Sequence, residues 1–395
     1  MSTHSELKNP AKPPFWRDPE KRSIVFQVAA VAFVGYILWA LTSNTMHNLA
    51  TRGIASGFDF LSFNTSFDIG ETLIEYSPES TYFRAFWVGV LNTLLVSSIG
   101  IVFATVLGFS VGIARLSKNF VISKMAAVYV DTLRNIPLLL QLFFWYFAVL
   151  RPLPLPKNAM AWGESIFLSN RGLVGPKPIF ESGFGWIFAA LTVAIVAVFF
   201  LARWAKKRQE ATGQQFPVFY ASIAVLVFLP LVAAAATGFP LSWDIPALKG
   251  FNFRGGMVIT PEFAALVGAL SIYTSSFIAE IVRAGVLAVN HGQTEAAFAL
   301  GIKPKFTMRL VIIPQALRVI IPPLTSQYLN LTKNSSLAAA IAYPDLVAVF
   351  AGTVLNQVGQ AVEIMAMTLA VYLFFSLVIS TFMNWYNAKM ALVER

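Results

Sequence analysis

The chain has 395 residues, of which 57% are hydrophobic and only 12% are charged, and its formal net charge is +10. Soluble domains carry about 25% charged residues, so this composition excludes a soluble globular protein, and its apolar content excludes a disordered one. The lysines and arginines lie in short runs between apolar segments, whereas nucleic-acid-binding proteins gather them on one face. The sequence therefore predicts an integral membrane protein that binds no nucleic acid.

Eight apolar segments follow one another along the chain, and each is long enough for a helix to cross about 30 Å of hydrocarbon. They are residues 24–42, 87–113, 125–150, 185–202, 217–237, 262–282, 319–342 and 364–388. These runs are too long and too continuously apolar for the strands of a membrane barrel, which alternate apolar and polar residues. The fold class predicted is all-α integral membrane, with about eight transmembrane helices and both termini on one side.

The first 23 residues are polar and rich in proline, and they lack the apolar core and cleavage site of a secretory signal. The first apolar segment is therefore expected to remain as an anchor. With the N-terminus placed in the cytoplasm, the inside segments hold nineteen lysines and arginines and the outside segments hold eight. Because cytoplasmic loops carry the excess of basic residues, both termini are predicted to be cytoplasmic, although outside segment 151–184 carries four basic residues.

Small residues recur every four positions in the second apolar segment, at Gly100, Ala104, Gly108 and Gly112. This spacing places them on one face of a helix, and small residues allow two helix backbones to approach closely in lipid. The face is interpreted as a packing surface within a helix bundle.

Four charged residues interrupt the apolar segments, namely Asp131, Arg134, Glu280 and Lys333. A charge near the bilayer centre costs about 2.5–3.5 kcal/mol on insertion scales, so each is expected to face protein or water. Asp131 and Arg134 are three residues apart and are expected to form an ion pair on one helix face. Glu280 and Arg283 have the same spacing and the same interpretation.

Lys333 has no acidic residue within one helical turn, and its segment is unusually polar. Pro322 and Pro323 precede it, so this span is predicted to be interrupted or locally unwound, and broken helices with polar side chains at mid-depth are typical of transport sites. The hypothesis is that the span lines a translocation path. Its polar contributors are expected to be Thr274, Asn330, Asn334 and Ser335.

The sequence allows two interpretations of Lys333. It could pair with a carboxylate on the path, either Glu280, Asp131 or that of a passing amino acid. Alternatively, it could form a purely structural salt bridge between helices.

Motifs of nucleotide hydrolysis and covalent catalysis are absent from the sequence. No glycine is followed by lysine, so there is no phosphate-binding loop, and neither G-x-S-x-G nor H-E-x-x-H occurs. There are no cysteines, and the three histidines lie far apart, so neither a disulfide nor a metal site is expected. The protein is predicted not to be an enzyme and to hold no cofactor of its own.

The loop 283–318 contains two predicted short helices. Thr294 is the expected N-cap of the first, and Gly301 suits the left-handed conformation that ends it. Pro304 can open the second helix, which is expected to run through Met308 and Arg309 toward Pro314. Two short helices at an angle form a rigid projection that could transmit a push from a soluble partner.

Glu295, Ala296 and Ala297, followed at fixed spacing by Gly301 and Pro314, resemble the EAA loop of ABC importer permeases. Val311 and Ile313 stand where that family usually has isoleucine and leucine. In the family this loop forms coupling helices that dock in a groove of the ATPase subunit. The resemblance assigns the coupling role to Thr294, Glu295, Ala296, Ala297, Gly301 and Pro314.

Three further blocks are similar to signatures of the polar amino-acid permeases. They are residues 131–141 (DTLRNIPLLLQ), 273–283 (YTSSFIAEIVR) and 331–337 (LTKNSSL). The resemblance covers about 82–150 and 260–390, and the general L-amino-acid permeases are closest in layout. It implies the architecture of a type I ABC importer permease, a five-helix core with an added N-terminal helix and an inserted central helix pair.

This layout divides the chain into four parts. Residues 1–80 hold the N-terminal tail, first membrane helix and outer loop, and residues 81–150 hold the first part of the core. Residues 151–258 hold the inserted outer loops and helix pair. Residues 259–395 hold the second part of the core, which includes a cytoplasmic coupling segment at 290–318.

The resemblance implies a permease subunit of an ABC importer for L-amino acids in the bacterial inner membrane. ATP would be bound and hydrolysed by a separate cytoplasmic ATPase, and alternating access would move the substrate. Further implied partners are a homologous second permease subunit, a periplasmic amino-acid-binding protein and membrane lipid. Asp131, Arg134, Glu280 and Lys333 would belong to the path or gate.

Two other function classes would require different features of the protein. A secondary transporter driven by an ion gradient would use Asp131, Glu280 and Lys333 as relay groups and would transport alone. A membrane-embedded transferase would need acidic or histidine clusters at a membrane face, and the four predicted outer loops show none at suitable spacing.

Overall fold

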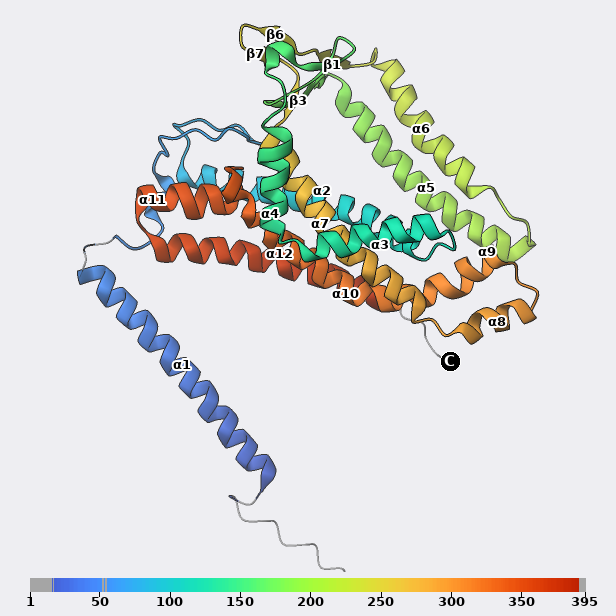
Figure 1. The fold of residues 1–395 in the computed structure, drawn as a ribbon, viewed down its shortest axis with the longest axis horizontal. Helices are drawn as coiled ribbons and strands as arrows, with labels where there is room; N and C mark the ends of the chain where they lie inside the picture. The colour runs from blue at the N-terminus through green and yellow to red at the C-terminus, as the bar shows by residue number, and fades with distance from the viewer. Residues whose placement is uncertain (1–15, 17, 52, 54, 391–395) are drawn as a thin grey trace, which may run out of the picture. The chain divides into compact units, whose positions relative to one another are not determined.

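The structure is a computed structural model that describes residue 16, residues 18–51, residue 53 and residues 55–390 (Figure 1). The predictions that concern the two ends of the chain lie outside these described residues. The described residues fall into two compact units. One lies within Met1–Val90 and Leu346–Val371, and the other within Leu91–Asp345 and Tyr372–Arg395.

Helices dominate the described chain, and seven of those described are long and apolar enough to cross a membrane. They are α1 (Pro19–Thr51), α2 (Tyr82–Arg115), α5 (Phe184–Thr212), α6 (Val218–Ala236), α7 (Pro261–Leu287), α10 (Ile313–Asn334) and α12 (Ala361–Met390). An eighth span is reached when a bent pair of helices between α2 and α5 is counted as one. The prediction of a helical membrane protein with about eight spanning helices is confirmed.

The bent pair replaces the continuous span expected over 125–150. Helix α3 (Phe120–Asn135) ends before Pro137, and α4 (Leu138–Phe143) continues directly into the π-helix η3 (Phe144–Leu150). The angle between α3 and the combined helix Leu138–Leu150 is 105°. The residue before a proline is disfavoured in the helical conformation, and Ile136 is extended, with φ −97° and ψ 126°. The expectation of one unbroken helix is therefore wrong at this proline.

Gln141 stabilises the bend from inside the protein. Its side chain is 5% exposed, and its Nε2 donates to the carbonyl oxygens of Leu133 and Ile136, both at 2.9 Å. These carbonyls lose helical partners at the break, and unpaired backbone groups are costly in a membrane. One amide side chain of α4 thus satisfies two carbonyl groups at the end of α3.

Helix α7 forms the centre of the second unit. It packs against α10, α3, α4 and η3, and its buried residues include Leu266, Leu270 and Ile278. The small face of α2 lies against it, because a Cβ on Gly108 would lie 2.5 Å from Ile278 and one on Gly112 would lie 2.8 Å from Val282. The packing role predicted for this face is confirmed.

Helix α10 continues through Pro322 and Pro323, where the sequence predicted an interruption. Each proline removes a backbone donor, but Ile320, Ile321 and Leu324 are buried in the core, and this packing maintains the helix. The irregular turns lie at its two ends instead. They are the π-helix η5 (Met308–Ile312) before it and the 3-10 helix η6 (Ser335–Ile341) after it.

Eight short strands flank the α5–α6 hairpin in sequence, and none was predicted. They are β1 (Met160–Trp162), β2 (Ile166–Ser169), β3 (Gly172–Gly175), β4 (Lys177–Phe180), β5 (Leu241–Asp244), β6 (Ala247–Lys249), β7 (Asn252–Arg254) and β8 (Met257–Ile259). All pairings are antiparallel, with a four-stranded sheet in the order β1-β2-β3-β8 and the two-stranded pairs β4–β5 and β6–β7. Together they form a β-strand module.

The β-strand module is joined to three helices of its unit. Strand β4 precedes α5, its partner β5 follows α6, and β8 leads into α7 through Thr260. The Thr260 hydroxyl caps α7 by accepting a hydrogen bond from the amide of Phe263 at 3.2 Å. The module therefore lies next to the first residues of α5 and α7 and the last residues of α6.

The first unit contains α1 and the loop 55–81, together with the π-helix η7 (Val347–Val354) and α11 (Leu355–Val358). Its core includes Phe350, whose ring contacts those of Phe60 and Phe86. Two hydrogen bonds tie distant segments together, from the Gly57 amide to Glu363 at 2.8 Å and between Tyr82 and Gln357 at 2.9 Å.

The close approach of α2 and α7 predicts a difference between two glycines. Gly108→Ala should lower the apparent Tm of the purified protein by several degrees, because overpacking a tight contact costs about 1–3 kcal/mol. Gly268→Ala, in α7, is the matched control, since a Cβ there meets nothing within 4 Å. Equal melting temperatures for the two variants would contradict the packing described above.

Candidate functional site

The coupling segment, residues 290–318, begins with helix α8 (His291–Ala299). Its N-cap is Asn290, whose side-chain oxygen accepts from the amide of Gly292 at 2.8 Å, and not Thr294 as predicted. The helix starts one turn earlier because asparagine is as good an N-cap as threonine or better. Gly301 has φ +72°, the left-handed conformation expected of it.

The second helix of the segment opens at Pro304, as predicted, and its first part is α9 (Pro304–Thr307). It does not end near Pro314 as a separate helix. It passes through the π-helix η5 directly into α10, so that one helical span runs from Pro304 to Ile341. A movement of α9 is therefore carried into α10 without an intervening loop.

The EAA residues of α8 differ in their surroundings. Ala297 is 4% exposed and packs inward, whereas Glu295 and Ala296 are exposed. Glu295 Oε1 lies 3.0 Å from Nδ1 of His291, one turn earlier. Phe298 and Leu300 beside them are 49% and 79% exposed, so α8 presents a small apolar surface next to a carboxylate.

A groove of about 550 Å³ lies at the base of α8. It is lined by the end of α7, the start of α8 and η5, with Leu287, His291, Thr294 and Met308 among its residues. Thr294 thus borders this groove instead of capping the helix.

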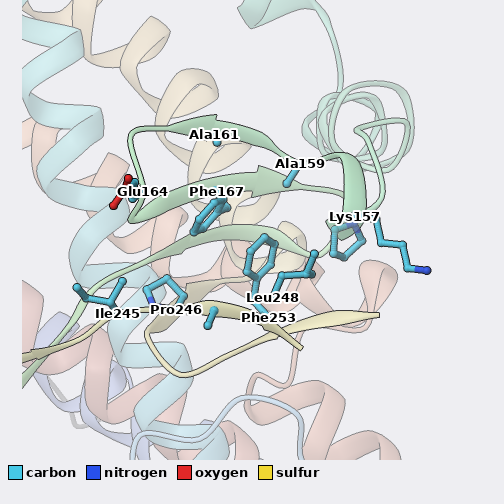
Figure 2. A pocket seen from close by; sticks show the side chains of 11 residues that line it. Lys157, Ala159, Ala161, Glu164, Phe167, Ile245, Pro246, Leu248 and Phe253 are labelled. Carbon is cyan, nitrogen blue, oxygen red and sulfur yellow. The ribbon is translucent and has the colours of Figure 1, made fainter. Parts of the chain in front are cut away.

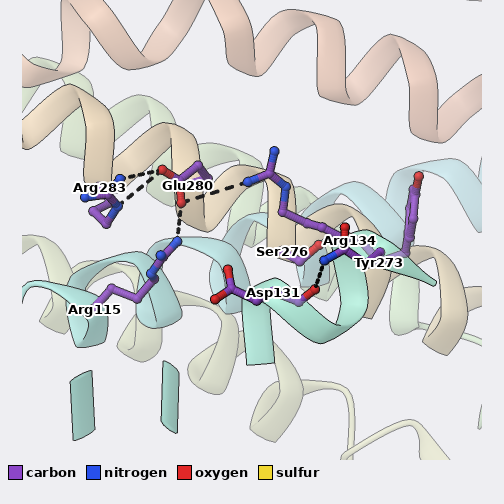
Figure 3. A network of polar contacts seen from close by, with 8 residues as sticks. Arg115, Asp131, Arg134, Tyr273, Ser276, Glu280 and Arg283 are labelled. Carbon is purple, nitrogen blue, oxygen red and sulfur yellow. Dashed lines mark hydrogen bonds and ion pairs between the residues drawn. The ribbon is translucent and has the colours of Figure 1, made fainter. Parts of the chain in front are cut away.

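An ion-pair cluster lies on α7, seven residues before that helix ends (Figure 3). Its centre is Glu280, which receives a charge-assisted hydrogen bond from Arg115 at the end of α2. Arg283 donates to the other carboxylate oxygen at 2.7 Å, as the spacing of the pair predicts. Arg134 of α3 lies 4.0 Å from the carboxylate. One carboxylate therefore connects three helices.

The ion pair expected between Asp131 and Arg134 does not form in the described structure. Arg134 points toward Glu280 instead, and its guanidinium lies 5.1 Å from the centre of the Phe277 ring on α7. A spacing of three residues permits a pair on one helix, but a carboxylate on the neighbouring helix competes for the same arginine. The cation–π contact adds to that attraction.

The residues predicted for the translocation path fall into two groups. Asn330 and Lys333 are exposed on α10, and Asn334 is half-buried. Thr274 and Ser335 are buried, at 3% and 0% exposure, and the Ser335 hydroxyl donates to the Thr332 carbonyl at 2.7 Å. Asn330 and Lys333 therefore lie on the surface of the described chain, whereas Thr274 and Ser335 are enclosed by it.

Lys333 has no ion-pair partner in the part of the chain that the structure describes. The expected partner Glu280 is bound by three arginines, and Asp131 forms no salt bridge among the described residues. Neither of the two expected carboxylates, nor a structural salt bridge to another helix, pairs with Lys333 among the described residues, and the carboxylate of a passing amino acid stays a hypothesis.

Arg115 is the cluster residue that sequence reasoning missed. It is the last residue of α2, its side chain is 14% exposed, and in the sequence it follows directly after an apolar segment. A basic residue in the last turn of a helix is a common feature, so it gave no signal of this contact.

The chain is similar in sequence to a known family and to individual proteins. Residues 212–392 match the family described as binding-protein-dependent transport system inner membrane component. The General L-amino acid transport system permease protein AapQ of Rhizobium johnstonii is 54% identical over 378 residues, covering 96% of this chain and 94% of that protein. The Putative amino-acid ABC transporter permease protein YhdX of Escherichia coli is 56% identical over 379 residues, covering 96% of each.

A solved structure described as "Crystal structure of an amino acid ABC transporter with histidines" also matches. It is 20% identical in sequence and covers 78% of this chain and 95% of that chain, with a TM-score of 0.45.

The ion-pair cluster predicts that Glu280 matters for stability. Glu280→Gln should lower the apparent Tm by several degrees, because removing one partner leaves the remaining charges of a partly buried network uncompensated. Asp131→Asn is the control, since Asp131 forms no salt bridge in the described structure, and its Tm should stay close to that of the wild type. A Glu280→Gln protein that melts like the Asp131→Asn protein would show that the cluster is not structural.

Proposed function

The chain belongs to the binding-protein-dependent permeases, the inner membrane components of ABC importers, and on this premise we propose that it moves L-amino acids by alternating access. It is a transport subunit and not an enzyme, and the ATPase lies in a separate subunit. The family also implies a substrate-binding protein as a partner. Nothing in the comparisons supports an ion-gradient-driven transporter.

The observation that carries the proposal is the polar face of α10. Ser326, Asn330 and Lys333 are exposed and recur at intervals of four and three residues, which places them on one side of a helix. A charged or amide side chain that faces lipid raises the free energy of the folded protein in the membrane. This face is therefore expected to contact water and a second protein surface. That requirement supports a second permease subunit, homologous to this one, that completes the path.

The proposed substrate is an L-amino acid, in keeping with the names of the two relatives above. Lys333 is a cation on the exposed face without a counter-charge in the described chain, and the α-carboxylate of an amino acid is a suitable partner. Asn330 lies one turn before it and can donate or accept a hydrogen bond. Thr274 and Ser335, which are buried, support the helices that line the path.

The proposed mechanism uses the two connections of the coupling segment. ATP binding draws the ATPase subunits together, and α8 and α9 move with them. Helix α9 is continuous with α10, which bears Lys333, while α8 follows α7, which bears Glu280. A movement of the segment therefore shifts both helices of the path relative to α2 and α3. ATP itself is bound by the partner subunit.

Orientation follows from the position of the coupling segment. An ATPase that uses cytoplasmic ATP requires the segment to face the cytoplasm, and the excess of lysine and arginine in the same set of loops supports this. We place the protein in the bacterial inner membrane with both termini in the cytoplasm and the β-strand module outside. Membrane lipid surrounds the apolar α5–α6 hairpin.

Reconstitution tests the proposed function. In proteoliposomes that contain the chain, its permease partner and its ATPase, uptake of labelled amino acids should require both ATP and the binding protein. Lys333→Met should reduce that uptake at least tenfold, because the carboxylate of the substrate loses its counter-charge. Lys389→Met, near the end of α12, is the control and should transport like the wild type.

Two results would contradict this assignment. Uptake by the chain alone under an ion gradient would support a secondary transporter. Unchanged uptake by the Lys333→Met complex at normal membrane levels would remove Lys333 from the path.

The exposed face of α8 predicts the site of ATPase docking. Glu295→Arg should abolish co-purification of the ATPase subunit, because it reverses a charge beside the exposed Phe298 and Leu300. Glu210→Arg, on the exposed last turn of α5, is the matched control and should leave co-purification intact. If both variants retain the ATPase, this face of α8 is not the docking surface.

A further inference from the structure

The β-strand module contains a groove of about 560 Å³ that plays no part in the site described above (Figure 2). Strands β1 and β2 border one side of it and the paired strands β6 and β7 border the other. Its lining is mainly apolar and includes Phe167, Ile245, Pro246, Leu248 and Phe253. The rings of Phe167 and Phe253 are stacked at 4.5 Å, which joins the two sides.

Two opposite charges lie at opposite ends of this groove, Glu164 at one and Lys157 at the other (Figure 2). Neither forms a salt bridge with any residue that the structure describes. The Lys157 ammonium lies 4.3 Å from the centre of the Phe251 ring, which is itself 83% exposed. The groove therefore combines an apolar floor with two charges that form no salt bridge with the described residues.

The groove lies beyond the apolar helices of its unit. The pair β4–β5 connects directly to α5 and α6, whereas the groove is built from the other strands. Figure 1 shows β1, β6 and β7 beyond the ends of α5 and α6 that lie away from α8 and α9. This position favours water and soluble proteins over the hydrocarbon of the membrane.

The module is firmly connected to α7. Strand β3 pairs with β8, and Gly172 lies so close to the carbonyl of Ile259 that no side chain fits between them. At the start of α7 the Tyr146 hydroxyl donates to Glu262 at 2.6 Å. A load applied to the module is therefore passed to the helix that bears Glu280.

We propose that this groove is a docking site for the extracytoplasmic binding protein that delivers the substrate. It takes a surface segment of that protein in which an apolar side chain lies between an acidic and a basic residue. The acidic residue pairs with Lys157 and the basic one with Glu164. This inference rests on the proposed function, because it assigns a surface to one of the partners of the importer.

Shape and charge favour a protein segment over other occupants. Aromatic pockets that take one large side chain are typical of the energetic centres of protein interfaces. A free amino acid has both charges on one carbon, whereas the charges of this groove lie at its two ends. Lipid headgroups are disfavoured by the distance of the groove from the apolar helices.

Cross-linking tests the identity of the occupant. The chain has no cysteine, so Ala161→Cys in the groove can be labelled selectively with a photo-reactive maleimide. Ser182→Cys, exposed between β4 and α5, is the matched control. In nanodiscs of phosphatidylethanolamine and phosphatidylglycerol, the Ala161 label should capture the purified, amino-acid-loaded binding protein at least ten times more often than the Ser182 label. Capture of phospholipid at Ala161 would overturn the proposal.

Binding and ATPase measurements test the role of the groove. Ala161→Trp should fill it, raise the Kd of the loaded binding protein at least tenfold and abolish its stimulation of ATP hydrolysis. Basal hydrolysis should not change, and Ser182→Trp should bind within a factor of two of the wild type. Lys157→Glu should also weaken binding.

The outcomes separate the two proposals. A normal response of the Ala161→Trp complex would overturn the docking inference alone. A wild-type complex that neither binds the binding protein nor responds to it would overturn both that inference and the proposed function.

Discussion

The contact of Glu280 with three arginines constrains how the helices of the second unit can move. Arg115 reaches it from α2, Arg134 from α3 and Arg283 from α7 itself. Three guanidinium groups repel one another, and the carboxylate that they share offsets this repulsion. Any rearrangement of α3 against α7 must therefore exchange partners at this carboxylate. Glu280 lies seven residues before the end of α7, and α8 follows after a short connection, so such an exchange is linked to the coupling segment.

The two short helices of the coupling segment connect to the core in different ways. Helix α8 follows α7 across Asn290, whereas α9 continues through η5 into α10. A π-helical turn is often found at functional positions because its wider turn can shift a helix by one residue. A movement of the coupling segment would thus displace α7 and α10 together, because both helices connect to it. This arrangement suits a subunit that must open one side of a path while closing the other.

The sequence predicted the features that depend on local rules. Gly301 is left-handed, Pro304 opens a helix and Arg283 pairs with Glu280, each as residue type and spacing indicate. Other features depend on contacts between segments that are distant in the sequence, and the spacing of residues along one helix does not predict such contacts. Arg134 prefers a carboxylate on another helix to the one three residues away, and Arg115 gave no signal at all. The strands of the module, three or four residues each, are too short for an alternating pattern to be recognised.

Helix α7 links the two ends of the second unit. It has 27 residues, which corresponds to about 40 Å at 1.5 Å per residue. Its first turn is fixed by the cap of Thr260 and by the hydrogen bond from Tyr146 to Glu262, and its last third is fixed by the Glu280 cluster. On either side of Glu280, the glycine face of α2 packs tightly against Ile278 and Val282. A helix held so closely moves as a rigid body, so a displacement of the β-strand module and a displacement of the coupling segment must act on the same element.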